Sequence, residues 1–492
     1  MDSPATLEHY KAGMLLSGAG DSTGFKRELN YSGPDIHEAK KQLGGLKNIT
    51  VKLPDWSVSD DTDLHLATAE ALATGKKGEE LLQEVALHYV EGMKDMTGRE
   101  PGGSTIMGAS MLKPGTEGGY RIPYNPESGG CGAAMRTMFI GLSPATLEHY
   151  KAGMLLSGAG DAIGFKWEFN YSGPDIHEAV KQLGGLKNIT VKLPDWSVSD
   201  DTVLHLATAE ALATGKKGEE LLQEVAFRYV EGMKDMTGRE PGGSTIMGAS
   251  MLKPGTEGGY RIPYNPRSGG CGAAMRTMCI GLRYPRPEQL SSLVAVAVET
   301  GRMTHPHPTG FLGGLASALF TAYAVQRRPI TEWGLGLVKE ACPAAKEFVK
   351  TAGYAVEETE RDWGYFTEKW EWYLELRGLS SGTGPVVWPD PYGPAERDKA
   401  YESFSWSGWG GSSGHDAPMI ALDALLGAGS NWEELMNRVA FHGGDSDSTA
   451  VIACCCWGLL YGTEGVPPGN YSNLEYRDRL ENSAEELYKL SH

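Results

Sequence analysis

Hydrophobic residues recur at helical spacing along most of the chain. Leu204, Ala207 and Ala211 follow this spacing, and Gly215 stands where the C-terminal cap of a helix is expected. Few runs show the strict alternation of a strand, and loops rich in glycine, proline and serine separate the helical stretches, notably 240–257, 264–272, 378–396 and 405–414. The pattern therefore predicts an all-α protein, with further helices at 287–300, 313–327, 344–356, 362–376, 417–426, 432–441 and 476–490.

The N-terminal part of the chain is duplicated. Residues 3–142 and 143–282 align without a gap at an offset of 140 and differ at ten positions. Solenoid repeats are shorter, roughly 20–50 residues, and need several copies to bury a core. We therefore expect a complete domain at 143–492, preceded at 1–142 by a degenerate duplicate of its N-terminal part.

The differences between the two copies have a direction. Apolar residues of the second copy become polar or charged in the first: Ile163, Trp167, Val180 and Val203 correspond to Thr23, Arg27, Lys40 and Asp63. Val180 follows Ile176 and precedes Leu183 at the spacing of a buried helix face, so Lys40 would place an ammonium group in the core. The first copy is thus predicted to be released from the need to pack its residues into a core. A recent duplication under weak constraint, or an error in the gene model, would leave the same pattern.

Composition narrows the class of protein. A net charge of −18 argues against nucleic acid or an anionic membrane as a partner. The N-terminus lacks the pattern of a signal peptide, and the apolar stretches 312–325 and 451–461 are too short to span a bilayer. Cys454, Cys455 and Cys456 are consecutive in a predicted helix and point in different directions, which favours buried, inert thiols. We expect a monomeric, cytoplasmic protein.

Two acidic strings carry the candidate chemistry. Val198–Thr202 reads VSDDT, with Ser199 placed as a helix N-cap and Asp200 and Asp201 in the first turn. Alternatively, the string is only a helix cap followed by two acids that the helix dipole favours, with no further chemical role. The second string, 442–449, reads HGGDSDST, and its Asp445 and Asp447 project to the same side if the backbone is extended there.

Together the strings offer four carboxylates and hydroxyls, an all-oxygen set that suits Mg²⁺ rather than Zn²⁺. An EF-hand is excluded because its 12-residue loop is missing. The first string also occurs at 58–62 but the second occurs once, so the chain can assemble one complete site.

Two glycine-rich loops accompany the acids. The loops at 408–414 and 269–272 can offer backbone N–H groups to a diphosphate. Such a loop alone is more often just a tight turn, and neither is a Walker A or dinucleotide motif. His415 and Asp416 lie beside serines, but adjacent residues rarely form a Ser–His–Asp triad, and no nucleophile elbow is present.

Several segments in order resemble the ADP-ribosylglycohydrolase family across essentially all of 143–492: residues 160–164, 166–169, 198–210, 301–305, 407–416 and 441–449. The resemblance implies an orthogonal, all-α helical fold with a binuclear Mg²⁺ site. It further implies hydrolysis of the N-glycosidic bond between ADP-ribose and arginine on proteins, with ADP-ribose as product.

The resemblance also implies roles for individual residues. Metal ligands fall on Ser199, Asp200, Asp201, Asp445, Asp447 and Ser448. Catalytic roles fall on Glu168, Asp200, Asp201 and Asp447. Substrate contacts fall on Gly242, Gly243, Ser244, Gly269, Arg276, Thr277, Met278, Trp406, Ser407, Ser412, Ser413 and Gly414. Trp406 departs from the family, in which a tyrosine is expected, and a tryptophan can stack on a base but lacks the phenol.

Elementary chemistry agrees with such a hydrolase. Glycosidic cleavage passes through an oxocarbenium-like state, which needs nearby negative charge and a positioned water. An aspartate of the cluster or Glu168 can accept the proton, and the choice between them is open. A catalytically silent ADP-ribose-binding or crystallin-like protein would lack Asp445 or Asp447, and both are present. A third hypothesis is a Mg²⁺-dependent phosphodiesterase, which would release AMP.

Overall fold

The described part of the chain is helical. The computed structural model describes residues 58–74, 76, 78–125, 145–168 and 171–491, together with Leu15 and Asp21. Within these residues the only β pairing is one isolated bridge between Gly270 and Ser413. The prediction of an all-α protein is confirmed. Contacts within the chain divide it into two compact units, Met1–Ser143 and Pro144–His492.

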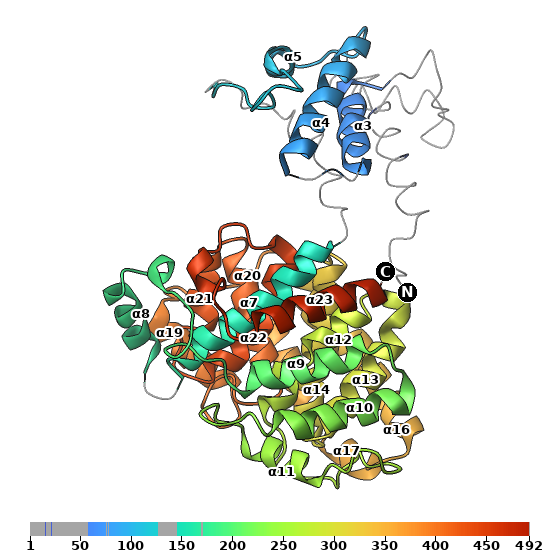
Figure 1. The fold of residues 1–492 in the computed structure, drawn as a ribbon, viewed down its shortest axis with the longest axis vertical. Coiled ribbons are helices and arrows are strands. Elements are labelled where there is room, and N and C mark those ends of the chain that lie inside the picture. The colour runs from blue at the N-terminus through green and yellow to red at the C-terminus, as the bar shows by residue number, and fades with distance from the viewer. Residues whose placement is uncertain are drawn as a thin grey trace. The chain divides into compact units, whose positions relative to one another are not determined.

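The first unit is small in its described part. Helix α3 (Asp60–Ala73) packs on α4 (Gly78–Gly92), which is followed by the short helix η2 (Met93–Asp95) and by α5 (Gly103–Met111). Figure 1 shows α3 and α4 side by side. The apolar residues buried there are Leu64, Ala67, Ala71 and Ala86.

The most extensive packing between two helices of the second unit, in its described part, joins α7 (Leu147–Phe165) to α22 (Ser446–Tyr461). Glycines let their backbones approach closely. A Cβ at Gly160 would lie 2.8 Å from the Ala450 carbonyl oxygen, and one at Gly164 would lie 2.5 Å from that of Ser446. The end of α7 thus meets the start of α22. Residues that follow α7 are therefore close to residues at the start of α22.

The other helices pack around this pair. In chain order they are α8 (Gly173–Gln182), η4 (Leu186–Asn188), α9 (Asp200–Ala213), α10 (Gly218–Gly232), α11 (Gly243–Met251), η5 (Cys271–Arg276), α12 (Met278–Arg283), η6 (Pro287–Gln289), α13 (Leu290–Arg302), α14 (Pro308–Val325), η7 (Ile330–Glu332), α15 (Trp333–Gly336), η8 (Leu337–Ala341), α16 (Cys342–Ala352), α17 (Val356–Asp362), α18 (Gly364–Leu376), α19 (Pro394–Phe404), α20 (Asp416–Ala428), α21 (Trp432–Val439), η9 (Pro468–Asn470) and α23 (Arg477–Ser491). Each of the seven further helices predicted above overlaps one of these.

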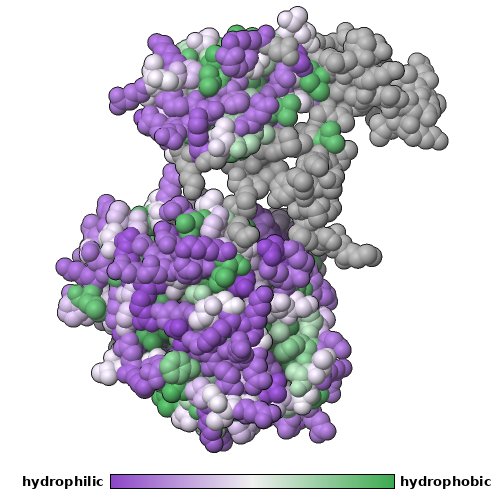
Figure 2. Space-filling view, turned by 45° about the vertical axis from the view of Figure 1, so that its right-hand side comes forward, coloured by the Kyte–Doolittle hydropathy of each residue, from purple (hydrophilic) through white to green (hydrophobic). Residues whose placement is uncertain are grey.

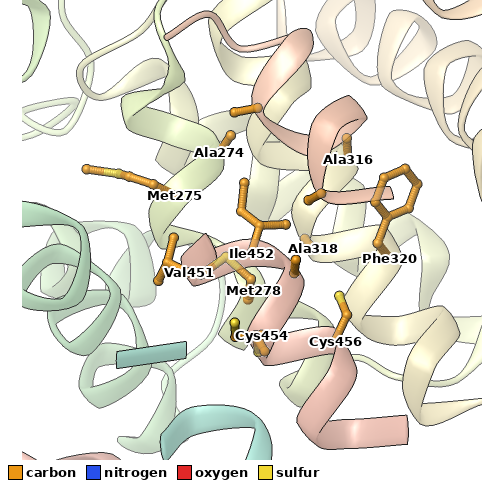
Figure 3. Packing of buried hydrophobic residues seen from close by; sticks show 14 of the residues in the cluster. Ala274, Met275, Met278, Ala316, Ala318, Phe320, Val451, Ile452, Cys454 and Cys456 are labelled. Carbon is orange, nitrogen blue, oxygen red and sulfur yellow. The ribbon is translucent and has the colours of Figure 1, made fainter. Parts of the chain in front are cut away.

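The core is dense around α22. Figure 3 shows Val451, Ile452, Cys454 and Cys456 of this helix among buried residues of η5, α12 and α14. All three consecutive cysteines are fully buried, and burial raises the pKa of Cys456 to about 12. The prediction that these thiols are buried is confirmed.

Helix α14 begins before the apolar stretch 312–325, which was expected to be too short to span a bilayer. Over Pro308–Val325 it is long and apolar enough to cross a membrane, the one such helix in the described part of the chain. Every residue of it is buried inside the protein, as in the core helix of a globular unit. The face visible in Figure 2 is mainly hydrophilic, with hydrophobic residues in small separate patches.

The positions at which the two copies differ in polarity are buried in the second copy. Ile163, Trp167, Val180 and Val203 are at most 7% exposed, as their apolar character predicts. Leu183 is 48% exposed because it caps α8, so its assignment to the buried face was wrong.

In the first copy, Thr23, Arg27 and Lys40 lie outside the described residues. Asp63 is described, and its carboxylate pairs with Arg99 Nε at 2.8 Å. Asp63 is therefore not an unpaired charge.

We expect residues 143–492 to fold when expressed alone, because the second unit has its own core. Circular dichroism should show a cooperative thermal transition. Val180→Lys should destabilise this fragment by about 3 kcal/mol or more, since the ammonium group would be buried. Lys181→Ala, at the exposed neighbouring position, is the matched control, with an effect within about 0.5 kcal/mol. A gradual, non-cooperative transition of the unsubstituted fragment would contradict the domain boundary.

Candidate metal centre

The first acidic string begins helix α9. The Ser199 hydroxyl accepts a hydrogen bond from the Asp201 N–H (3.1 Å), so Ser199 is the N-cap, as predicted. Asp200 and Asp201 occupy the first turn and are 6% and 3% exposed. Two carboxylates are thus held inside the protein at a helix start, where the helix dipole favours negative charge.

Asp161 of α7 holds this string in place. Its carboxylate accepts hydrogen bonds from the N–H groups of Ser199 (3.0 Å) and Thr202 (3.0 Å), and the side chain is fully buried. Burial, with the nearby Asp447 carboxylate, raises the pKa of Asp161 to about 7. Asp161 was not among the predicted site residues, and its available signal was a single acid within an apolar, glycine-rich helix.

The second acidic string begins helix α22. Asp445 is the residue before the helix, and Asp447 lies in its first turn, so the backbone is not extended across both residues and that condition for their projecting to the same side is not met. The Asp445 N–H donates to the Gly410 carbonyl (2.9 Å), and the Ser446 hydroxyl donates to the Gly164 carbonyl (3.0 Å). The first bond ties the start of α22 to the loop at 408–414, and the second fixes it against the end of α7.

Glu168, three residues beyond α7, completes the cluster. Carboxylate oxygens of Glu168, Asp445 and Asp447 lie within 4.8 Å of one another, and all three side chains are buried. Burial, followed by the neighbouring acids Asp447 and Asp445, raises the pKa of Glu168 to about 12. Burial and the Asp447 carboxylate likewise raise the pKa of Asp200 and Asp201, which identifies one electrostatic cluster.

The donor set fits a hard cation. In the part of the chain that the structure describes, Asp201 Oδ2 is buried and has no hydrogen-bond partner. Mutually repelling buried carboxylates are stabilised by protons or by a cation, and oxygen ligands favour Mg²⁺. This acidic cluster could bind a metal ion. The predicted ligands are Ser199, Asp200, Asp201, Asp445, Asp447 and Ser448.

Cys271 also borders the cluster and was given no role by sequence analysis. Its thiol donates to Asp445 Oδ2 (3.2 Å) and accepts a hydrogen bond from the Ser448 hydroxyl (3.5 Å). Burial, followed by the charge of Asp445, raises the pKa of this thiol, so it stays protonated and serves as a donor. Its place in a glycine-rich loop was the available signal.

The two glycine-rich loops are joined next to the cluster. Gly270 pairs with Ser413, and the Gly414 N–H donates to the Gly269 carbonyl (2.9 Å). The N–H groups of Gly411 and Ser413 donate to Asp416. The Ser412 N–H donates to the Trp409 carbonyl (3.3 Å), so the N–H groups of residues 411–414 are all used within the protein, and the tight-turn alternative holds for this part of the loop.

Asp416 consequently organises a loop. It faces backbone N–H groups, while His415 Nε2 bonds the Phe404 carbonyl (2.8 Å). The rejection of a Ser–His–Asp triad made of these neighbours is confirmed.

Some of the predicted substrate contacts are accessible. Trp406 is 55% exposed, and its ring lies 4.9 Å from that of Tyr365 and 6.0 Å from that of His307. A Cβ at Gly269 would meet the Trp406 ring at 3.4 Å, so this loop lies under the indole. Other predicted contacts that are exposed or partly exposed are Gly242, Gly243, Ser244, Ser407 and Ser412.

Other predicted contacts are buried. Arg276, Thr277 and Met278 are fully buried, as is most of Ser413. The Arg276 guanidinium lies 4.4 Å from the Tyr229 ring centroid and donates to the Thr300 carbonyl (3.0 Å). Burial raises the pKa of Asp200, and the positive charge of Arg276 partly opposes this rise. Arg276 therefore acts on the acidic cluster from the protein core.

Comparison with known proteins agrees with the resemblance. The model of the ADP-ribosylglycohydrolase family, described as "ADP-ribosylglycohydrolase", matches residues 2–147 and again residues 142–492. ADP-ribosylhydrolase ARH1 of Dictyostelium discoideum is 44% identical over 369 residues, which are 69% of this chain and 93% of that protein. An Acanthamoeba polyphaga mimivirus protein, named as a putative ADP-ribosyl glycohydrolase, is 31% identical over 66% of this chain and 66% of its own length. A solved structure, described as "ADP-ribosylglycohydrolase-related protein complex", is 20% identical with a TM-score of 0.45 and covers 70% of this chain and 99% of its own.

The chain belongs to the ADP-ribosylglycohydrolase family, a family of metal-dependent hydrolases. The family model matches both copies, the first over the N-terminal part alone.

Asp447→Asn tests the metal ligands. The substitution should abolish the rise in melting temperature that Mg²⁺ gives by mass action, because one carboxylate of the cluster is lost. Without Mg²⁺ the melting temperature should stay level or rise, since repulsion among the acids is relieved. Differential scanning fluorimetry with a Mg²⁺ titration measures both, with the exposed Glu178→Gln as control. An unchanged Mg²⁺-dependent shift in the variant would refute the assignment of Asp447.

Proposed function

We propose that residues 143–492 are a Mg²⁺-dependent ADP-ribosylarginine hydrolase, which removes ADP-ribose from arginine on proteins. The observation that carries this proposal is the buried acidic cluster, in which Glu168 meets Asp445 and Asp447 within 4.8 Å. It is supported by the family and by the similarity to a relative named as an ADP-ribosylhydrolase. A cytoplasmic, monomeric protein and a site for two Mg²⁺ ions belong to the same proposal.

Different side chains have different roles in the proposed reaction. Carboxylates of the cluster supply the negative charge that an oxocarbenium-like ribose requires, from positions fixed by two helix starts. Mg²⁺ would orient the ribose hydroxyls and lower the pKa of a bound water. Glu168, on the segment that follows α7, would accept a proton from an attacking water once a bound cation offsets the burial and repulsion that raise its pKa. The exposed ring of Trp406 offers a stacking surface for the adenine base.

Turnover of ADP-ribosylated arginine should depend on Mg²⁺. The full chain should release ADP-ribose from an ADP-ribosylated arginine substrate in millimolar Mg²⁺, and chelation with EDTA should abolish the release. A substrate with ADP-ribose on serine measures the specificity for the guanidinium leaving group. Release of AMP would indicate a phosphodiesterase instead. A folded protein that binds ADP-ribose without turnover would be the catalytically silent alternative.

The duplicate at 1–142 should contribute nothing to turnover. Its VSDDT string has a single downstream partner, for which the second copy has the intact core. The double substitution of Asp60 and Asp61 to Asn should leave kcat/KM within about twofold of the unsubstituted chain. The same change at Asp200 and Asp201 should reduce it by at least about a thousandfold. Equal losses from the two doubles would show that both copies use the C-terminal acids.

A further inference from the structure

The backbone of the first acidic string is held at every N–H. Within residues 198–202, two N–H groups bind Asp161 and one binds the Ser199 hydroxyl, as described above. The Asp200 N–H donates to the Arg239 carbonyl (3.2 Å), and the Val198 N–H donates to Glu475 Oε2 (3.2 Å). The string is thus held from one side by α7 and from the other by Arg239 and Glu475.

Arg239 and Glu475 form one bracket. The Arg239 guanidinium is buried, donates to the Val198 carbonyl (2.7 Å) and pairs with Glu475 Oε1 at 2.8 Å. Glu475, just before α23, therefore binds the N–H of Val198 while its partner binds the C=O of the same residue. Both polar groups of the backbone next to Ser199 are fixed by this one ion pair.

The first copy keeps the arginine of this bracket, as Arg99, but pairs it with a different acid. The Arg99 guanidinium donates to the Val58 carbonyl (3.0 Å), and the Asp60 N–H donates to the Arg99 carbonyl (3.2 Å). These bonds match those of Arg239. The acidic partner of Arg99 is Asp63 at 2.8 Å, at the position where the second copy has the buried Val203. The chain therefore contains two solutions to the same requirement, a carboxylate for this arginine.

We infer that Arg239 and Glu475 are positioning residues for the metal centre, which hold Ser199, Asp200 and Asp201 in the geometry that binds the cation. Neither side chain is among the predicted ligands, and their effect passes through the backbone of Val198 and Asp200. The inference rests on the proposed use of this string as a metal site. Outer partners of metal ligands typically alter metal affinity by about 10- to 100-fold.

The test introduces into the second copy the acid that pairs with this arginine in the first copy. In the full chain, Glu475→Gln keeps the shape of the side chain but removes its charge. It should raise the Mg²⁺ concentration at the midpoint of thermal stabilisation about tenfold, with kcat at saturating Mg²⁺ within about twofold of the unsubstituted chain. Adding Val203→Asp should restore the midpoint, because the introduced carboxylate would pair with Arg239 as Asp63 pairs with Arg99. The neutral control, Val203→Asn in the Glu475→Gln background, should not restore it.

Two results would overturn the inference. One is a Glu475→Gln chain with an unchanged Mg²⁺ midpoint, whatever its melting temperature without metal, since that would show a purely structural ion pair. The other is a folded double variant, Glu475→Gln with Val203→Asp, whose midpoint is no better than that of the control with Val203→Asn. If the unsubstituted chain is stabilised by Mg²⁺ but hydrolyses no ADP-ribosylated arginine, the proposed function fails while the thermal measurements still decide the role of this pair.

Discussion

Burial of several carboxylates that also repel one another is the constraint on which the rest of the structure depends. Burial and the neighbouring acids raise the pKa of Glu168, Asp200, Asp201 and Asp447, so the cluster cannot hold its full negative charge without a cation. Two helix N-termini point at the same place, and their dipoles partly offset the cost. The close glycine contact of α7 with α22 then brings Glu168 to the second string.

Much of the fold could be predicted because its determinants are local. Helical periodicity, the Ser199 cap and the apolar runs are readable within one turn or a few turns of sequence, and the structure agrees at these places. Leu183 shows the limit: its spacing is right for a buried face, but the helix ends there and the side chain points to solvent. Helix ends depend on what packs beyond them, which spacing does not record.

The site was predictable only in part, for a similar reason. Its two acidic strings stand out in the sequence, whereas Asp161 and Cys271 matter through partners that lie 38 and 174 positions away. The glycine-rich loop at 408–414 shows the reverse case. Its composition suits an anion, yet Asp416, only a few residues along the chain, takes two of its N–H groups. Composition indicates which donors exist, and only the folded chain shows which of them are already used.

The duplicate separates the two interpretations of the VSDDT string. In the first copy, Ser59 caps α3 through the Asp61 N–H (3.1 Å), and Asp21 accepts the Ser59 N–H (3.0 Å), as Asp161 does in the second. The local half of the site therefore forms wherever this sequence occurs, and by itself it is a helix cap with acids that the dipole favours. Asp445 and Asp447 are encoded once, so they alone can turn such a cap into a metal centre. Asp445 and Asp447 meet Glu168 of the second copy, where Arg239 is bound by Glu475, and this supports the proposal that residues 143–492 carry the function.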